Sequence, residues 1–428
     1  MSLNDDKPRV AITGAGVISS LGQGISLLAK SLLNGENKFI RSARFPNLPF
    51  SVIAAELKGF IFEEALKQYP ALPDNLLMSA YKAGRRAPLV VQTSLIAALE
   101  AWQQAKLAER NIESTRIGLV IAGQNTTQAY QHNLQAAFQQ EPSYLSPTYA
   151  LHFMDTDQVG TLSEVFGIHG EGLTVGGASA SGNVAIIQGQ RLIQHGHIDV
   201  CLVVGVLADL SPMELQGFYN IGALGGRRFH EEACKACRPF DRDHEGFIWG
   251  QASGSLLLES TEKAQKAGVP LLGEIRGSAM LLDGNRLTHS NLQGEMRVMQ
   301  QALKNAHISS NDIDYMNAHG SSSVLGDEVE ITAIRSVFGE ATGQLWLNAT
   351  KGLLGHCLWS AGIVEAIATL LQLQGGFVHA NRNLENPIDD EIRFVPQHSE
   401  TANIQTAMSN SFGFGGINTS IIFTRGDR

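Results

Sequence analysis

The sequence has little cysteine and no long apolar runs. Four cysteines among 428 residues are too few for a disulfide framework, and the chain does not open with the basic and apolar segments of a secretion signal. Apolar runs such as 198–207 reach about half the length that a membrane span requires. The sequence therefore predicts a cytoplasmic protein that does not cross a membrane.

Positive charge is also scarce. The formal net charge is −9, and no stripe of Lys and Arg is present, which excludes a general nucleic-acid-binding role. Charged residues make up 17% of the chain and hydrophobic residues 43%, a balance typical of well-packed globular proteins. A chain of this length favours two similar halves or one large α/β body.

The expected elements alternate between strands and helices. A buried strand is expected at 117–122 and further strands at 200–207 and 313–317, the last elements are expected at 405–410 and 418–424, and helices are expected at 93–108, 157–166, 328–337 and 358–373. This alternation predicts an α/β fold with a mostly parallel sheet covered by helices. A polar, Lys-rich stretch at 259–268 is the expected join between two halves, 1–260 and 261–428.

The first element is expected to be a strand that turns at Gly14-x-Gly16 and leads into a helix at 24–33. The two glycines could begin a dinucleotide-binding fingerprint. However, Ser19 stands where that fingerprint has its third glycine, and Glu36 does not follow a second strand. A nucleotide site is therefore disfavoured.

Ser179 follows a strand-like segment and two glycines, and an apolar helix ending near Gly196 begins just after it. A serine presented between a strand and a helix is typical of a nucleophile elbow. The N-terminus of the helix supplies N–H donors and a positive dipole end, which stabilise a negative oxygen. The alternative is a serine that only caps the helix.

Three other segments surround a polar side chain with small residues, and each follows a strand-like run: 317–323, 351–356 and 410–416. They contribute His319, Lys351 and His356. Either histidine alone could be a hydrogen-bonded core residue. Together with Ser179, these side chains form a candidate catalytic group.

The same segments resemble the motifs of the ketosynthase family, in the family's order and along the whole chain. The matching segments are Ala178–Gly182 (A-C-A-S-G, with Ser for Cys), Arg238–Asp241 with Gly246-Phe247, His319–Ser323 with Gly326-Asp327 (H-G-T-G-T-x-x-G-D), Lys351 with Gly355-His356 (K-x-x-x-G-H), and Asn410–Gly416 (N-S-F-G-F-G-G). This resemblance implies a thiolase fold. Two pseudo-duplicated βαβαβαββ halves would pack as five layers, α-β-α-β-α, usually in a homodimer.

The resemblance also implies a substrate, an acyl or malonyl thioester on the phosphopantetheine arm of an acyl carrier protein, and no separate cofactor. In ketosynthases the cysteine accepts an acyl chain, two histidines assist the decarboxylation of malonyl, and the resulting carbanion attacks the acyl thioester. His319 and His356 correspond to these histidines, and Lys351 to the residue that orders the site.

Further roles follow from the same resemblance. The backbone N–H groups of Ser179 and Phe414 correspond to the oxyanion hole. Ser321 and Ser323 keep hydroxyls where relatives have Thr and, with Phe412 and Phe414, are expected to contact the pantetheine arm.

The serine at position 179 changes the expected chemistry. A cysteine ionises near neutral pH, whereas a serine needs a well-placed base, so acyl loading should be impaired. Decarboxylation needs only donors for the enolate oxygen. Ketosynthase-like proteins with this replacement make acetyl-carrier protein from malonyl-carrier protein in polyketide pathways that build β-methyl branches, where a hydroxymethylglutaryl-synthase-like partner takes the acetyl group.

We therefore expect a malonyl-acyl carrier protein decarboxylase. One alternative is an acyltransferase or condensing enzyme in which Ser179 is acylated. The other is a non-catalytic partner akin to chain-length factors, although such relatives generally lose the histidines that this chain keeps.

The sequence has three further features: a cysteine pair, a basic cluster and an unusual glutamine. Cys234-x-x-Cys237 has the spacing of a zinc knuckle but lacks a second ligand pair, so no metal site is expected. Lys82, Arg85 and Arg86 form a basic cluster that could dock an acidic carrier protein or simply be a solvated helix face. Gln251 replaces the Glu of the family's G-E-G segment, and the sequence does not explain this change.

Overall fold

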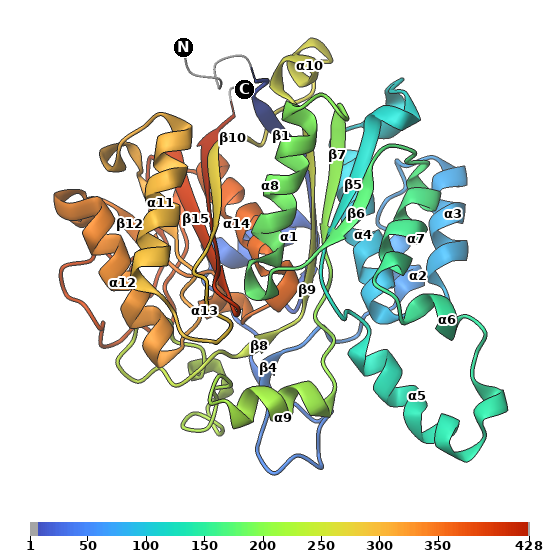
Figure 1. Ribbon diagram of the computed structural model, residues 1–428, viewed down its shortest axis with the longest axis horizontal. Coiled ribbons are helices and arrows are strands. Elements are labelled where there is room, and N and C mark those ends of the chain that lie inside the picture. The colour runs from blue at the N-terminus through green and yellow to red at the C-terminus, as the bar shows by residue number, and fades with distance from the viewer. Residues whose placement is uncertain (1–6, 427–428) are drawn as a thin grey trace.

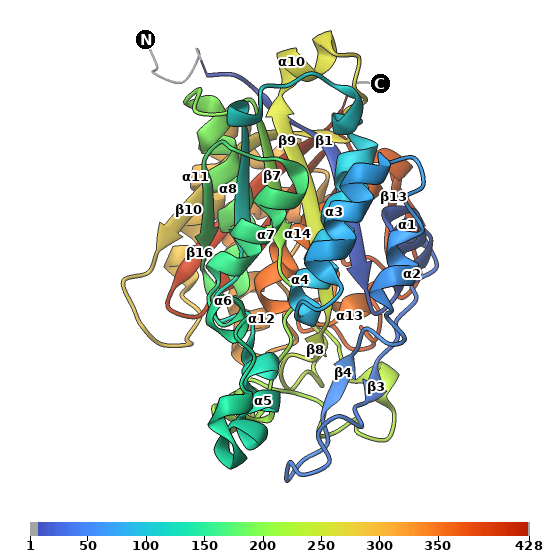
Figure 2. The same ribbon diagram turned by 90° about the vertical axis from the view of Figure 1, so that its right-hand side faces the viewer.

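The protein is built around one large sheet. The computed structural model describes residues 7–426, and within them eleven strands form this sheet (Figure 1, Figure 2). In spatial order, with β2 (Gly22–Gln23) paired to β1, the strands are β12 (Trp346–Asn348), β11 (Tyr315–Asn317), β15 (Thr406–Gly413), β16 (Ile417–Arg425), β10 (Gly273–Leu282), β1 (Val10–Ser19), β9 (Ala252–Ser260), β7 (Val200–Gly205), β5 (Ile117–Ala122) and β6 (Gly172–Val175).

The sheet consists of two five-stranded sets in equivalent order, β1-β9-β7-β5-β6 and β10-β16-β15-β11-β12, which meet where β1 pairs with β10. Pairing is parallel in the outer part of each set and antiparallel in the centre. The expected mostly parallel sheet is therefore wrong for the centre. A connection as short as the one between β15 and β16 can join only antiparallel strands. The predicted boundary at residues 260 and 261 falls between β9 and β10 and stays a prediction.

Helices form three layers around the two strand sets (Figure 1). α8 (Ser181–Gln194) and α14 (Ala361–Gly375) lie between the sets and contact strands of both. α4 (Leu89–Gln104) and α7 (Thr156–Phe166) cover the first set, and α11 (Leu292–Ala306) covers the second, with α12 (Val324–Phe338) packed beside it. The order of layers is therefore α-β-α-β-α, as predicted.

The remaining elements are short or peripheral. They are α1 (Ile25–Leu33), α2 (Phe62–Leu66), α3 (Asp74–Gly84), α5 (Gln128–Gln140), α6 (Tyr149–His152), α9 (Pro212–Asn220), α10 (Thr261–Lys266), α13 (Lys351–Leu354), the small sheet β3 (Ile40–Arg41), β4 (Ile53–Ala55) and β8 (Trp249–Gly250), and the pair β13 (Phe377–Val378) and β14 (Glu400–Thr401). Within residues 7–426, no helix combines the length and the apolarity needed to cross a bilayer.

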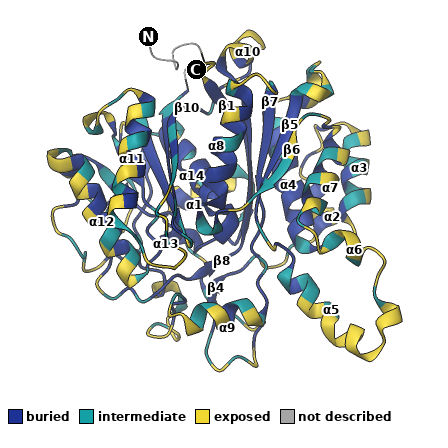
Figure 3. Ribbon diagram, in the orientation of Figure 1, coloured by how far each residue is buried: buried dark blue, intermediate teal, exposed yellow. Residues whose placement is uncertain are grey.

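The middle helices are buried, whereas the outer helices expose one face (Figure 3). α14 is apolar around most of its circumference, as expected for a helix enclosed on all sides. Its buried Glu365 is an exception, because a carboxylate is rarely enclosed without a partner. The partner of Glu365 belongs to the candidate site.

The glycine turn predicted at Gly14 and Gly16 is wrong, because β1 runs unbroken to Ser19. A Cβ atom at Gly14 would lie 2.3 Å from the carbonyl oxygen of Ala101, and one at Gly16 would lie 2.0 Å from that of Ala97. Both carbonyls belong to α4. The glycines therefore let a helix approach the strand closely and do not form a turn, although the pairing with β9 is irregular between Ile12 and Gly14.

Other expected boundaries shift by a few residues. The helix predicted at 93–108 is α4, which begins directly after Pro88. The helix predicted from residue 358 begins as a 3₁₀ turn, Leu358–Ser360, before α14. The join predicted at 259–268 contains the end of β9 and all of α10, and the segment predicted to follow a strand at 410–416 begins inside β15.

We expect Gly16→Ala to destabilise the protein by about 1–3 kcal/mol, because its new methyl group would overlap the backbone of α4. Gly160→Ala in α7 is the matched control, since a Cβ atom there meets nothing within 4 Å, and it should be neutral or stabilising by up to about 1 kcal/mol. Urea unfolding of both variants measures the difference. Equal stabilities would contradict the packing role of Gly16.

Candidate active site

Ser179 lies in a 3₁₀ turn, Ala178–Ala180, that enters α8. Ala178 has a φ of 47°, an unusual conformation for a non-glycine residue. The Ser181 hydroxyl fastens this turn, since it donates to the Ala178 carbonyl at 2.7 Å and accepts the Gly177 N–H at 2.9 Å. Such strain persists only where the surroundings fix it, and it is common at functional sites.

His356 reaches Ser179 because α8 and α14 touch near their N-termini. A Cβ atom at Gly182 would lie 2.5 Å from the backbone nitrogen of Ile363, and one at Gly362 would lie 2.6 Å from that of Asn183. The two glycines therefore permit a backbone contact between the halves of the chain. This contact brings the segment before α14 against the turn that carries Ser179.

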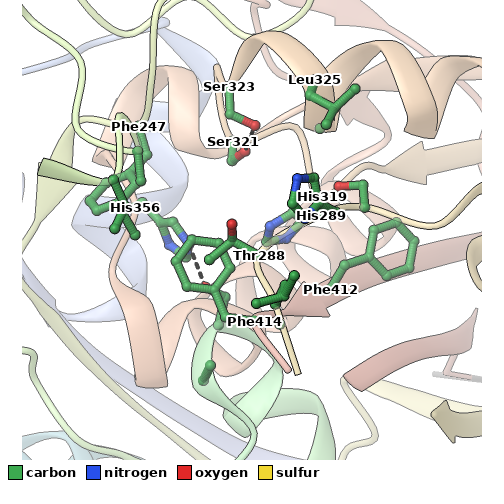
Figure 4. A pocket seen from close by; sticks show the side chains of 18 of the residues that line it. Phe247, Thr288, His289, His319, Ser321, Ser323, Leu325, His356, Phe412 and Phe414 are labelled. Carbon is green, nitrogen blue, oxygen red and sulfur yellow. Dashed lines mark hydrogen bonds between the residues drawn. The ribbon is translucent and has the colours of Figure 1, made fainter. Parts of the chain in front are cut away.

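The imidazole of His356 is fixed at both nitrogens. The Leu358 N–H lies 3.1 Å from Nδ1, and Ser179 Oγ lies 2.8 Å from Nε2 (Figure 4). A backbone N–H can only donate, so Nδ1 of the neutral ring is an acceptor and Nε2 carries the hydrogen. His356 therefore donates to the Ser179 hydroxyl and does not accept its proton.

Lys351 orients the second imidazole, that of His319. Its ammonium group donates to Glu365 Oε1 at 2.5 Å and to the His319 carbonyl at 2.5 Å, and it lies 3.4 Å from His319 Nδ1. An ammonium group has no acceptor, so Nδ1 accepts and Nε2 of the neutral ring carries the hydrogen. The structure thus brings together Ser179, His319, Lys351 and His356.

His356 is buried and His319 is half-buried, and their rings are 5.6 Å apart between centroids and nearly perpendicular. Burial and the nearby Lys351 charge lower the pKa of both imidazoles well below the usual value, with a further contribution from His356 at His319. Both rings are therefore neutral at pH 7. Each offers an Nε2–H donor without a net charge.

Glu330 on α12 holds the backbone of the His319 loop, because its carboxylate accepts the N–H groups of His319 and Gly320, both at 2.8 Å. Burial raises its pKa to about 7. Sequence reasoning missed both Glu330 and Glu365. For Glu365 the available signal was a lone acidic residue within an apolar helical segment, which in a buried helix requires a cationic partner. Glu330 gave no such signal, because Asp327 and Glu328 lie in the same helix.

Three of these four side chains, Ser179, His319 and His356, line a cavity of about 360 Å³. Phe412 and Phe414 also line the cavity, as do Ser321 and Ser323, whose hydroxyls are hydrogen-bonded at 3.0 Å (Figure 4). The residues expected to contact a pantetheine arm thus share one space with the imidazoles. Their roles in binding stay predictions.

The predicted docking residues lie elsewhere. Lys82, Arg85 and Arg86 are exposed at the C-terminal end of α3, and none of them lines the cavity. In Figure 1, α3 lies at the right, whereas α9 and α12, which border the cavity, lie below and to the left. A docking role for this cluster stays a prediction.

The Cys234-x-x-Cys237 pair is split between surface and core. Cys234 is exposed, whereas Cys237 is buried and its thiol donates to the carbonyl oxygen of Lys351 at 3.0 Å. Among residues 7–426, no group of three or more His, Cys, Asp or Glu side chains is arranged to hold a metal ion.

The layered fold and the turn that presents Ser179 to two imidazoles define a protein of the thiolase fold. Two family models match the chain, "Beta-ketoacyl synthase, N-terminal domain" over residues 7–264 and "Beta-ketoacyl synthase, C-terminal domain" over residues 272–385. The chain belongs to the beta-ketoacyl synthase family.

Curated relatives match almost the whole chain. The "Polyketide biosynthesis malonyl-ACP decarboxylase PksF" of Bacillus subtilis is 39% identical over 417 residues, covering 97% of this chain and 96% of the relative. The "3-oxoacyl-[acyl-carrier-protein] synthase 2" of Coxiella burnetii is 30% identical over 425 residues, covering 98% and 99%. The family therefore includes both a named decarboxylase and named condensing enzymes among the relatives of this chain.

Solved structures agree with the fold. The ishigamide ketosynthase/chain length factor superposes with a TM-score of 0.85 at 25% identity, covering 98% of this chain and 99% of that chain. A type II polyketide acyl-carrier protein in complex with its ketosynthase contains a chain that superposes with a TM-score of 0.84, also at 25% identity, covering 98% and 100%.

The structure explains the glutamine at position 251. Gln251 is buried, its side-chain oxygen accepts the Leu57 N–H at 3.0 Å, and its amide nitrogen donates to Asp209 Oδ1 at 3.2 Å. Asp209 also pairs with Arg44. A glutamate at position 251 would keep the first contact but would place a second carboxylate against Asp209.

We expect Gln251→Glu to lower the free energy of unfolding at pH 7 by about 1–3 kcal/mol, because it replaces a hydrogen-bond donor by a buried like charge. The double variant Gln251→Glu/Asp209→Asn should recover part of the loss, since the new amide can donate to the new carboxylate. Urea unfolding tests both variants. A single variant as stable as the parent protein would contradict this explanation.

Proposed function

We propose that the protein decarboxylates malonyl-acyl carrier protein to acetyl-acyl carrier protein in polyketide biosynthesis. The observation that carries this proposal is the hydrogen-bond direction at His356, whose Nδ1 accepts the Leu358 N–H and whose Nε2–H therefore faces Ser179. The site has two neutral N–H donors beside one cavity. It supplies no base to the serine.

This arrangement suits the loss of CO2 from a malonyl thioester. When the bond to the carboxylate breaks, its electron pair enters an enolate, and negative charge develops on the thioester oxygen. The Nε2–H of His319 would hold that oxygen, and the Nε2–H of His356, which donates to Ser179 Oγ in the resting site, would be shared between the two oxygens. Removing one preorganised donor of this kind costs about 3–4 kcal/mol in other enzymes, so two such donors can account for substantial catalysis.

The arrangement does not suit a condensing enzyme that loads an acyl group on Ser179. A serine becomes nucleophilic only when a base takes its proton during attack. Within residues 7–426, the Ser179 hydroxyl has His356 as its only hydrogen-bond partner, and that partner is a donor. Acylation of Ser179 is therefore disfavoured.

The comparisons support the same choice. The relative named as a malonyl-ACP decarboxylase is 39% identical, against 30% for the 3-oxoacyl synthase of Coxiella burnetii. A carrier protein bound to a structurally similar ketosynthase supports a carrier-bound substrate. We further propose a homodimer, and a hydroxymethylglutaryl-synthase-like enzyme that uses the acetyl product to build a β-methyl branch.

Incubation with malonyl-carrier protein should convert it to acetyl-carrier protein, seen as the loss of 44 Da, the mass of CO2, from the intact carrier. We expect His319→Ala to lower kcat by about 10²- to 10³-fold, because one enolate donor is lost. Exposed Ser336→Ala on α12 is the control and should retain full activity. An unchanged carrier mass with the parent protein would refute the proposed function.

The rate of CO2 release should stay constant from about pH 7.5 to pH 9, because the lowered pKa values of His319 and His356 leave both donors neutral throughout. This window lies above the pKa of Glu330, about 7, so the carboxylate under the His319 loop is mostly ionised throughout. An imidazolium donor would instead lose about tenfold in rate per pH unit above its pKa. Initial rates in overlapping buffers separate the two cases.

A further inference from the structure

The proposed decarboxylation leaves one requirement unmet, because the enolate carbon must receive a proton before acetyl-carrier protein can leave. The imidazoles stabilise the enolate oxygen and do not by themselves protonate carbon. A proton donor should lie beside the space between them and carry a hydrogen that no protein acceptor uses.

The Ser179 hydroxyl meets both conditions. Its oxygen accepts the His356 Nε2–H at 2.8 Å, so its own hydrogen is not used in that bond. Among residues 7–426, no other side chain or backbone group is hydrogen-bonded to this hydroxyl, and Ser179 lines the cavity. The hydrogen is therefore free to point toward a bound substrate.

Distance also favours Ser179. An enolate oxygen held by His356 would lie about 2.8–3.0 Å from Nε2, and Ser179 Oγ lies 2.8 Å from the same atom. The enolate carbon is two bonds from its oxygen, so it lies within a few ångströms of the hydroxyl. Resting on the proposed function, we infer that Ser179 is a catalytic residue whose hydroxyl protonates the enolate carbon.

The step balances as follows in atoms and charge. The bond between the carboxylate and the methylene carbon breaks, CO2 leaves, and the electron pair forms the enolate. The carbon takes the proton from Ser179 Oγ, and the resulting alkoxide is held by the His356 N–H. Water then returns a proton to Oγ, and the hydroxide that remains combines with CO2 to give hydrogencarbonate.

The direction of transfer is favourable, because the carbon of a thioester enolate is a stronger base than an alkoxide. The His356 N–H also stabilises the oxygen as it becomes negative. The same hydrogen bond that makes Ser179 a poor nucleophile in the resting site thus makes it a suitable acid. A condensing reaction has no need of such an acid, because its carbanion is consumed by an acyl group.

Glu295 on α11 is the competing donor. It lines the cavity, is buried, and its Oε2 has no hydrogen-bond partner within residues 7–426. Burial, together with the nearby carboxylates of Glu330, Asp283 and Asp327, raises its pKa well above the usual value and so favours the protonated form. Unlike Ser179, it has no hydrogen bond to either imidazole.

The test follows malonyl-carrier protein in an equal mixture of H2O and D2O, with carrier and enzyme equilibrated beforehand so that the methylene positions match in every sample. Mass spectrometry of the acetyl-carrier protein gives the deuterium content of the newly formed C–H bond. A thiol retains less deuterium than a hydroxyl in mixed water. Ser179→Cys should therefore shift the new bond toward protium, whereas the control Ser336→Ala should match the parent protein.

Ser179→Ala should lower kcat by about 10²- to 10⁴-fold, the usual contribution of a general acid, with little change in KM or melting temperature. Unchanged kcat in Ser179→Ala, or an unchanged isotope ratio in Ser179→Cys, would overturn the inference. So would an isotope ratio that responds to Glu295→Gln and not to Ser179→Cys, which would assign the proton to Glu295. A parent protein that leaves malonyl-carrier protein intact would instead defeat the proposed function itself.

Discussion

The hydrogen bond between His356 and Ser179 joins the two halves of the chain, and the chemistry of the site depends on its direction. Ser179 comes from the turn before α8, and His356 comes from the segment before α14. The Leu358 N–H decides the direction, because it occupies the only lone pair that a neutral imidazole would have for a serine proton. If the Leu358 N–H did not donate to Nδ1, His356 could accept the Ser179 proton, and both side chains would have different roles.

A buried ion pair between Lys351 and Glu365 keeps the imidazole of His319 in the same form as that of His356, neutral and with its hydrogen on Nε2. Lys351 and Glu365 are almost completely enclosed, and an enclosed charge is tolerated only when it is paired. The pair supplies a fixed donor to the His319 carbonyl and a positive charge beside both rings. Burial is the larger cause of the lowered pKa values of both imidazoles, and this charge lowers them further, so both donors remain neutral.

The layers could be predicted from the sequence. The grouping of Ser179, His319 and His356 with Lys351 could also be predicted, because these residues lie in short motifs with a recognisable order. The prediction failed for glycine, because glycine occurs both in turns and where a helix packs closely on a strand. Gly14 and Gly16 look like a turn, but they allow α4 to approach β1, a contact with residues 80 or more positions away. Sequence also could not give the direction of the His356 hydrogen bond, because a backbone amide carries no side-chain signal. Gln251 became interpretable only once Asp209 was seen beside it.

The serine oxygen at position 179, in place of a cysteine sulfur, does more than make this side chain a weaker nucleophile. A thiol is a weak hydrogen-bond acceptor, whereas a hydroxyl is a strong one and also donates. With oxygen at position 179, the imidazole N–H has a firm partner, and the serine, which lines the cavity, keeps a hydrogen that no acceptor within residues 7–426 uses. The surrounding site needs no other change for this purpose, because the imidazoles that would stabilise an enolate are retained. One atom, the oxygen at position 179, can therefore change the outcome in a fold suited to carbon–carbon bond formation, so that the enolate is protonated. This requires that the fold still holds His356 as a donor.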